Sequence, residues 1–179
     1  MCIRDRSATA RTAGFNTVDI GQMVPASLLF MMMLMFIGAG ATSTGGGIKV
    51  TTFAVVLLAT RAFLTKRPHV TAFGRTLSPQ IVTRSLAIII VSTMVLMLAM
   101  FLLMLTESQS FDKIMFETIS AFATVGLSTG ITASLSEPGK LILVLVMICG
   151  RLGPLTLAIM LARPVETRIR YPEESVYTG

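Results

Sequence analysis

Long apolar segments alternate with short polar ones along the chain, and the length of each apolar segment predicts how it lies in a membrane. Residues 85–105 are 21 residues without a charge, which is about 30 Å of helix and enough to cross a bilayer once. Residues 141–162 form a second long apolar segment. Residues 114–123 are also compatible with a helix but are far too short to cross.

The short segment 114–123 is followed by a Thr-x-Gly loop, a pattern that favours a re-entrant structure. Backbone that is not helical is tolerated at membrane depth only where protein buries it or where it lines a watery cavity. Glycine permits the dihedral angles that turn successive carbonyl groups to one side, where they can replace the hydration shell of a cation. The sequence therefore predicts carbonyl ligands for a cation at Thr124, Val125, Gly126 and Leu127.

The same pattern occurs 112 residues earlier, which predicts an internal repeat. The earlier copy consists of Thr12, Ala13, Gly14 and Phe15, followed by Asn16 and Thr17. The same offset places Gly38 on Gly150, inside the apolar segment that follows each copy. Membrane transport proteins are often built from repeats around a central pathway, so the earlier copy is predicted to supply further cation ligands.

Residues 38–47 (GAGATSTGGG) interrupt two apolar, helix-like segments at 24–37 and 48–60. Glycine costs about 1 kcal/mol against alanine in a helix, so a transmembrane helix is expected to break here. A phosphate-binding loop is excluded, because Gly45 is followed by Gly46 rather than by lysine. A glycine-rich patch for helix packing remains the alternative to a flexible intramembrane loop.

Composition and charge place the chain in a membrane. It is 53% hydrophobic and only 13% charged, which excludes an ordinary soluble domain. The net charge of +6 does not indicate nucleic-acid binding, because the basic residues cluster beside the apolar segments. Residues 61–84 contain five lysines and arginines and no acid, which predicts the cytoplasmic side; residues 106–113 and 130–140 are expected outside.

Two charged residues inside the apolar segments are candidates for function. Glu117 either attracts cations or braces the predicted filter by accepting backbone hydrogen bonds. Arg151 lies at mid-depth, where charge is costly, and either faces the pathway or ties down the structure by pairing with carbonyl groups or with Glu117. Asp112 is expected to cap the helix that contains Glu117, and Pro154 is expected to kink the last helix.

No set of residues in the sequence favours an enzyme or a metal centre. There is no histidine pair, no aspartate pair at membrane depth and no serine with a plausible base, so no catalytic residue is predicted. Cys2 and Cys149 do not form a disulfide framework. The 13 methionines are interpreted as adaptable apolar bulk that faces lipid or neighbouring helices.

Three stretches of the chain resemble the Trk/Ktr superfamily of potassium uptake proteins, specifically the Ktr-type membrane subunit. They are residues 11–19 (RTAGFNTVD), 38–52 (GAGATSTGGGIKVTT) and 150–156 (GRLGPLT). The resemblance runs from about residue 7 to about residue 164. It implies an all-α integral membrane protein with helix–pore-loop–helix repeats, re-entrant pore helices and a broken transmembrane helix.

A full member of this superfamily has four such repeats, of which this chain resembles the end of the third and all of the fourth, as in a C-terminal fragment. The expected divisions are a non-native leader at 1–6, the end of the third repeat at 7–60, a cytoplasmic linker at 61–84, the fourth repeat at 85–164 and a cytoplasmic tail at 165–179.

The resemblance also implies roles for residues and partners. The gating loop would comprise Gly38, Gly40, Thr42, Ser43, Thr44, Gly45, Gly46 and Gly47, and Arg151 would be a cationic barrier in the pore. The implied protein conducts potassium through the plasma membrane of a prokaryote, which it crosses several times. Sodium is left open as a coupling ion, and no cofactor or further metal is expected.

Expected partners are a second copy of the chain, a cytosolic nucleotide-binding regulatory subunit and the lipid bilayer, without nucleic acid. A non-conducting membrane scaffold is the first alternative function, and an intramembrane enzyme is the last.

Overall fold

The computed structural model describes residues 9–10, 14, 20–38, 40, 45–67, 69–72 and 74–153. The predictions of a leader at 1–6, a kink at Pro154, the end of the fourth repeat and a tail at 165–179 lie outside these residues.

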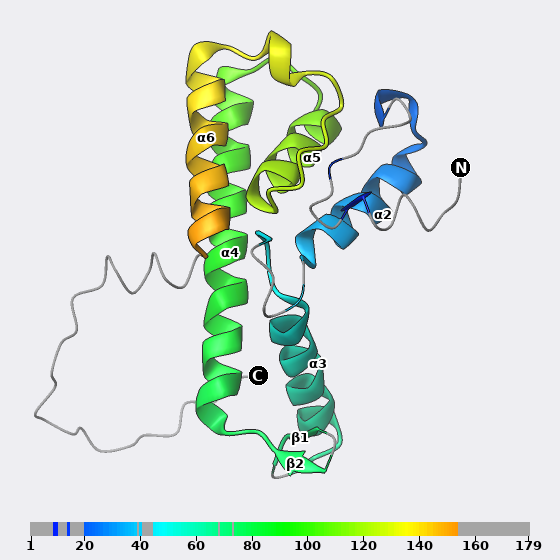
Figure 1. Ribbon diagram of the computed structural model, residues 1–179, viewed down its shortest axis with the longest axis vertical. Coiled ribbons are helices and arrows are strands. Elements are labelled where there is room, and N and C mark those ends of the chain that lie inside the picture. The colour runs from blue at the N-terminus through cyan, green and yellow to red at the C-terminus, as the bar shows by residue number, and fades with distance from the viewer. Residues whose placement is uncertain are drawn as a thin grey trace, which may run out of the picture.

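The described part of the chain is mostly helical (Figure 1). A short helix η2 (Ile20–Gln22) is followed by α2 (Pro25–Phe36) and α3 (Val50–Leu64). A small antiparallel hairpin, β1 (Thr71–Ala72) and β2 (Arg75–Thr76), leads into α4 (Pro79–Thr106). The remaining elements are α5 (Phe111–Phe122), η3 (Thr132–Ser134) and α6 (Glu137–Leu152).

Helix α4 extends along almost the full height of the structure. Its 28 residues span about 42 Å, and within the described residues it is the one helix long and apolar enough to cross a membrane. Figure 1 shows α5 and α6 beside its upper part and α3 beside its lower part, with the hairpin at the lower end. Its outer face exposes Met94, Met97, Phe101 and Leu105, whereas Leu103 is buried.

Helix α5 lies between two apolar cores, and most of its side chains are therefore buried. One core joins α5 to α4 and α6 through Leu103, Phe122 and Leu143. The other joins α5 to α2 and to the segment after α5 through Met35 and Phe116, among others. Because α5 is packed against both cores, the segment that follows its last residue, Phe122, is held in position.

Two backbone hydrogen bonds join the end of α2 to the residues before α3. The amide of Gly38 donates to the carbonyl of Ile48 at 2.8 Å, and the amide of Ile48 donates to the carbonyl of Phe36 at 3.2 Å. These two bonds link the residues on either side of the segment 38–47, so the C-terminal end of α2 lies next to the N-terminal end of α3. That α2 and α3 are one interrupted transmembrane helix remains a prediction.

Three helices begin or end beyond the limits predicted from charge. Helix α3 continues to Leu64, and α4 begins at Pro79 instead of residue 85, so the connection predicted as 61–84 is shorter. Arginine is a good helix former, and a charge that ends an apolar segment does not end the helix. Helix α6 also begins before residue 141, at Glu137, because Ser136 caps it and Pro138 suits its first turn.

Asp112 is not the cap of α5. The N-cap position is Ser110, and Asp112 lies inside the first turn. Its negative charge near the positive end of the helix dipole still favours the helix start.

Candidate functional site

The segment that follows α5 turns back along that helix. The amide of Val125 donates to the carbonyl of Ser120 at 3.0 Å, and the hydroxyl of Ser120 donates to the carbonyl of Leu127 at 2.5 Å. Thr124 and Gly126 both have positive φ, of 51° and 83°. An added Cβ at Gly126 would meet nothing within 4 Å, so backbone conformation rather than crowding favours glycine here.

Glu117 holds the far part of this segment. Its carboxylate is buried, with the residue only 5% exposed, and accepts bonds from a single stretch of chain. Oε1 accepts from the hydroxyl of Ser128 at 2.5 Å and from the amide of Thr129 at 2.9 Å. Oε2 accepts from the hydroxyl of Thr132 at 3.0 Å. A buried carboxylate satisfied in this way fixes the segment against α5.

The segment 38–47 contacts the beginning of the loop after α5. The amide of Gly46 donates to the hydroxyl oxygen of Thr124 at 3.0 Å. A Cβ on Gly46 would lie 2.8 Å from that oxygen and 2.9 Å from the carbonyl oxygen of Phe122. Only glycine therefore fits this approach without movement of the neighbouring backbone.

Gly150 of α6 packs against the same carbonyl group. A Cβ on Gly150 would overlap the carbonyl oxygen of Phe122. Gly46 and Gly150 thus bring two separate backbone segments against the last residue of α5.

Gly14 of the earlier Thr-x-Gly copy contacts the later copy. Its φ is +66°, and a Cβ added to it would lie 2.8 Å from the carbonyl oxygen of Val125. The two copies therefore meet at backbone distance. Thr12, Ala13 and Phe15, and Thr42, Ser43 and Thr44 of the predicted gating loop, lie outside the described residues.

The remaining described glycines of the predicted gating loop differ in their surroundings. An added Cβ on Gly38 would overlap the carbonyl of Gly46, whereas one on Gly40 would meet nothing within 4 Å. Gly47 has a positive φ of 80°, and Gly45 is half-buried. Gly38, Gly46 and Gly47 are therefore tightly constrained.

A cavity of about 310 Å³ lies between the loop after α5 and helix α6. Polar groups of Glu117, Ser120 and Ser128 face apolar groups of Leu143 and Met147 around it. Since a water molecule occupies about 30 Å³ of liquid, this space admits several waters or a hydrated cation.

Arg151 lies in the last turn of α6, directly after Gly150, and is exposed. Within the described residues it forms no ion pair with Glu117, whose carboxylate is already bonded to the chain between Ser128 and Thr132. The predicted alternative in which Arg151 pairs with Glu117 is therefore not what the structure shows.

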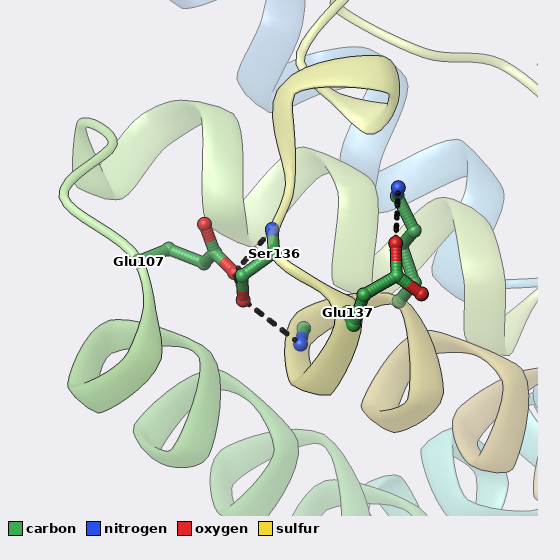
Figure 2. Close-up of polar contacts among 5 residues, drawn as sticks. Glu107, Ser136 and Glu137 are labelled. Atoms are coloured by element: carbon green, nitrogen blue, oxygen red, sulfur yellow. Dashed lines mark hydrogen bonds and ion pairs between the residues drawn. The ribbon is translucent and has the colours of Figure 1, made fainter.

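Sequence reasoning missed a second carboxylate, Glu107 at the end of α4. It accepts bonds from the amide of Ser136 at 3.0 Å and from the Ser136 hydroxyl, and the oxygen of that hydroxyl accepts from the amide of Gly139 at 3.3 Å (Figure 2). The group ties the end of α4 to the start of α6. The sequence Ser-Glu-Pro at 136–138 is a helix-start signal, but nothing in the sequence links it to Glu107.

The fold and the site define a helical membrane protein in which a short buried helix presents a glycine-containing loop. The chain matches the TrkH family, described as cation transport protein, over residues 6–169, and it belongs to this family.

Relatives with known names are similar along nearly the whole chain. It is 65% identical over 174 residues to Ktr system potassium uptake protein B of Vibrio alginolyticus, a match that covers 97% of this chain and 38% of that protein. It is 42% identical to the protein of the same name from Bacillus subtilis (strain 168), over 97% of this chain and 39% of that one. It is 38% identical to the potassium/sodium uptake protein NtpJ of Enterococcus hirae, over 97% and 40%. The chain thus spans about two fifths of the length of these relatives.

A solved structure shows the same fold. The crystal structure of the potassium transporter TrkH from Vibrio parahaemolyticus matches with a TM-score of 0.73 and 23% identity, over 87% of this chain and 35% of that one.

We expect Glu117→Gln to release the loop after α5. The amide group of glutamine brings a donor where the carboxylate accepts, and charge-assisted bonds contribute roughly 1.5–3 kcal/mol each. Amide hydrogen exchange at Thr129 should therefore accelerate about ten- to a hundredfold, measured by mass spectrometry on the purified protein.

Glu137→Gln is the matched control, because the Glu137 side chain is 90% exposed and bonded to Lys140 at the surface. Equal exchange at Thr129 in both variants would show that Glu117 does not hold the loop.

Proposed function

We propose that this chain is part of the pore-forming subunit of a potassium uptake system, in which backbone carbonyl groups bind the dehydrated ion. The observation that carries the proposal is the contact between Gly14 and the carbonyl of Val125, which brings the two Thr-x-Gly copies together at positive-φ glycines. The names of the relatives, which are potassium uptake proteins, support the choice of ion. One relative is named for both potassium and sodium, so sodium remains open as a further ion.

The local structure suits a cation at this loop. Helix α5 ends at Phe122, directly before the loop, so the negative end of its dipole points toward the proposed ligands. Thr124 and Gly126 have the positive φ that redirects carbonyl groups. The carboxylate of Glu117 holds the part of the loop between Ser128 and Thr132 against α5. It is held by hydroxyl and amide donors, so it is not positioned as an ion ligand.

This chain would supply two parts of the filter, from Thr12, Ala13, Gly14 and Phe15 and from Thr124, Val125, Gly126 and Leu127. The rest would come from other parts of a full-length protein, since the chain spans about two fifths of its relatives. A homodimer and a cytosolic nucleotide-binding regulatory subunit belong to the same proposal, and copurification with the full-length protein would test them.

Gly126→Ser in a full-length protein that carries this sequence should weaken selection of potassium over sodium. Serine is strained at φ near +83°, and the carbonyl groups would shift. The expected loss is about tenfold in the flux ratio, equivalent to about 1.4 kcal/mol, measured as ion uptake into liposomes.

Gly130→Ser is the matched control, because Gly130 also has a positive φ and open space but lies outside the proposed ligands. If neither variant changes the selectivity, Gly126 is not part of the filter. If the unsubstituted full-length protein conducts no potassium, the scaffold alternative is favoured instead.

We also propose that the segment 38–47 gates the pathway together with Arg151. The bond from Gly46 to Thr124 supports a direct link between this segment and the filter. Arg151 follows Gly150, which packs on Phe122 at the same end of α5. A loop and a cationic side chain near one level would both oppose a permeating ion.

Deletion of residues 40–45 and Arg151→Ala should each raise potassium flux a few-fold, because each removes an obstruction. The combined variant should gain less than the two separate gains predict, since obstructions at one depth are not independent. Arg84→Ala, an exposed arginine on α4, is the control. A joint gate would be contradicted if the combined variant showed the full gain in flux expected from two independent changes. It would also be contradicted if Arg151→Ala lowered the flux.

A further inference from the structure

A basic pocket lies at the C-terminal end of α3, far along the chain from the proposed filter. It is a cavity of about 120 Å³, lined by Arg61, Thr65, Arg67, His69 and Thr71, with Ala62 and Leu58 also at its wall. Helix α3, the turn after it and strand β1 each contribute to this pocket.

The turn after α3 is built so that basic side chains converge. Lys66 adopts a positive φ of 51°, which reverses the chain direction. The amide of Arg67 then donates to the carbonyl of Ala62 at 2.9 Å, and the amide of Thr65 donates to the carbonyl of Arg61 at 3.0 Å. These bonds satisfy the last carbonyl groups of the helix and bring Arg67 back beside Arg61.

Among the residues that the structure describes, no carboxylate is paired with the charges in this pocket. No aspartate or glutamate occurs between residues 61 and 84. Within the part of the chain that the structure describes, neither Arg61 nor Arg67 bonds a carboxylate, whereas Lys140 pairs with Glu137 elsewhere. Two guanidinium groups on one small cavity repel each other, and an anion bound between them relieves this repulsion.

The donors of the pocket suit a phosphate group. Arginine binds phosphate through paired N–H groups, and Arg61 and Arg67 supply two such groups. The hydroxyl of Thr65 is already donated to the carbonyl of Arg61 at 2.7 Å, so Thr71 and His69 are the remaining side chains that can donate. A pocket of about 120 Å³ has room for a phosphate group.

Apolar side chains beside the pocket indicate where the phosphate comes from. Phe63 and Leu64, between Arg61 and Lys66 in the chain, are 83% and 75% exposed. Exposed apolar groups interleaved with cations at the end of an apolar helix suit the boundary between headgroups and acyl chains. We infer that this pocket binds the phosphate of an anionic phospholipid headgroup, with Phe63 and Leu64 inserted among the lipids. The inference does not depend on the ion that the protein transports.

The test titrates phosphatidylglycerol into the detergent-purified full-length protein and counts bound lipids by native mass spectrometry. The double variant Arg61→Gln/Arg67→Gln should bind this lipid at least fivefold more weakly. Arg75→Gln/Arg84→Gln removes the same charge from the same region but not from the pocket, and it should change affinity less than twofold. Arg61→Lys/Arg67→Lys, which keeps the charge, should be intermediate.

A second pair of measurements separates the lipid from a soluble phosphate. Phe63→Ser/Leu64→Ser should also weaken phosphatidylglycerol binding, and millimolar inorganic phosphate should not displace the lipid. The inference is overturned if both arginine pairs lose affinity equally, if phosphatidylcholine binds as well, or if inorganic phosphate competes fully. It is also overturned if the arginine variant keeps its lipid but loses a cytosolic protein partner. An unfolding temperature equal to that of the unsubstituted protein shows that a variant is folded. If the arginine variant does not fold, the Phe63→Ser/Leu64→Ser variant tests the inference in its place.

Discussion

Close backbone packing around the C-terminal end of α5 is the constraint on which the rest of this structure depends. The carbonyl of Phe122 is approached by Gly46 from the segment between α2 and α3, and by Gly150 from α6. A side chain at either glycine would push these elements apart, because a backbone carbonyl cannot move aside as a flexible side chain can. The loop after α5 therefore keeps a fixed position relative to both neighbours.

This packing connects the proposed filter to the proposed gate. The residue after the packed carbonyl is Ala123, and the next residue, Thr124, accepts the bond from Gly46. A movement of the segment 38–47 would therefore change the surroundings of the first proposed ligand. On its other side, the loop is tied to α5 through Glu117, so the two ends of the loop are held by different partners.

Local sequence features predicted much of the helical structure. The length of the apolar segment 114–123 predicted a short helix, and the run of glycines at 38–47 predicted the end of α2 and the start of α3. The repeat aligned Gly14 with Gly126, and both have positive φ. Such features can be read from sequence because they depend on spacing and on the conformational freedom of single residues.

Tertiary contacts could not be predicted in the same way. The donors to Glu117 lie 11 to 15 residues away, and Glu107 and Ser136 are 29 apart, so no local pattern links them. The pocket after α3 has no local sequence signal, because Lys66, rather than glycine, adopts the positive φ of the turn that forms it. Helices α3 and α4 continue past the charged residues Arg61 and Arg84, because arginine is itself a good helix former and the end of an apolar segment does not mark the end of a helix.

Anomalous diffraction from crystals of a full-length protein grown in rubidium, a heavier substitute for potassium, tests the central claim most directly. The account predicts rubidium within coordination distance of the carbonyl oxygen of Val125, beside Gly14 of the other repeat. A rubidium position at Glu117, or anomalous density elsewhere in the pathway with none at these carbonyl groups, would contradict it.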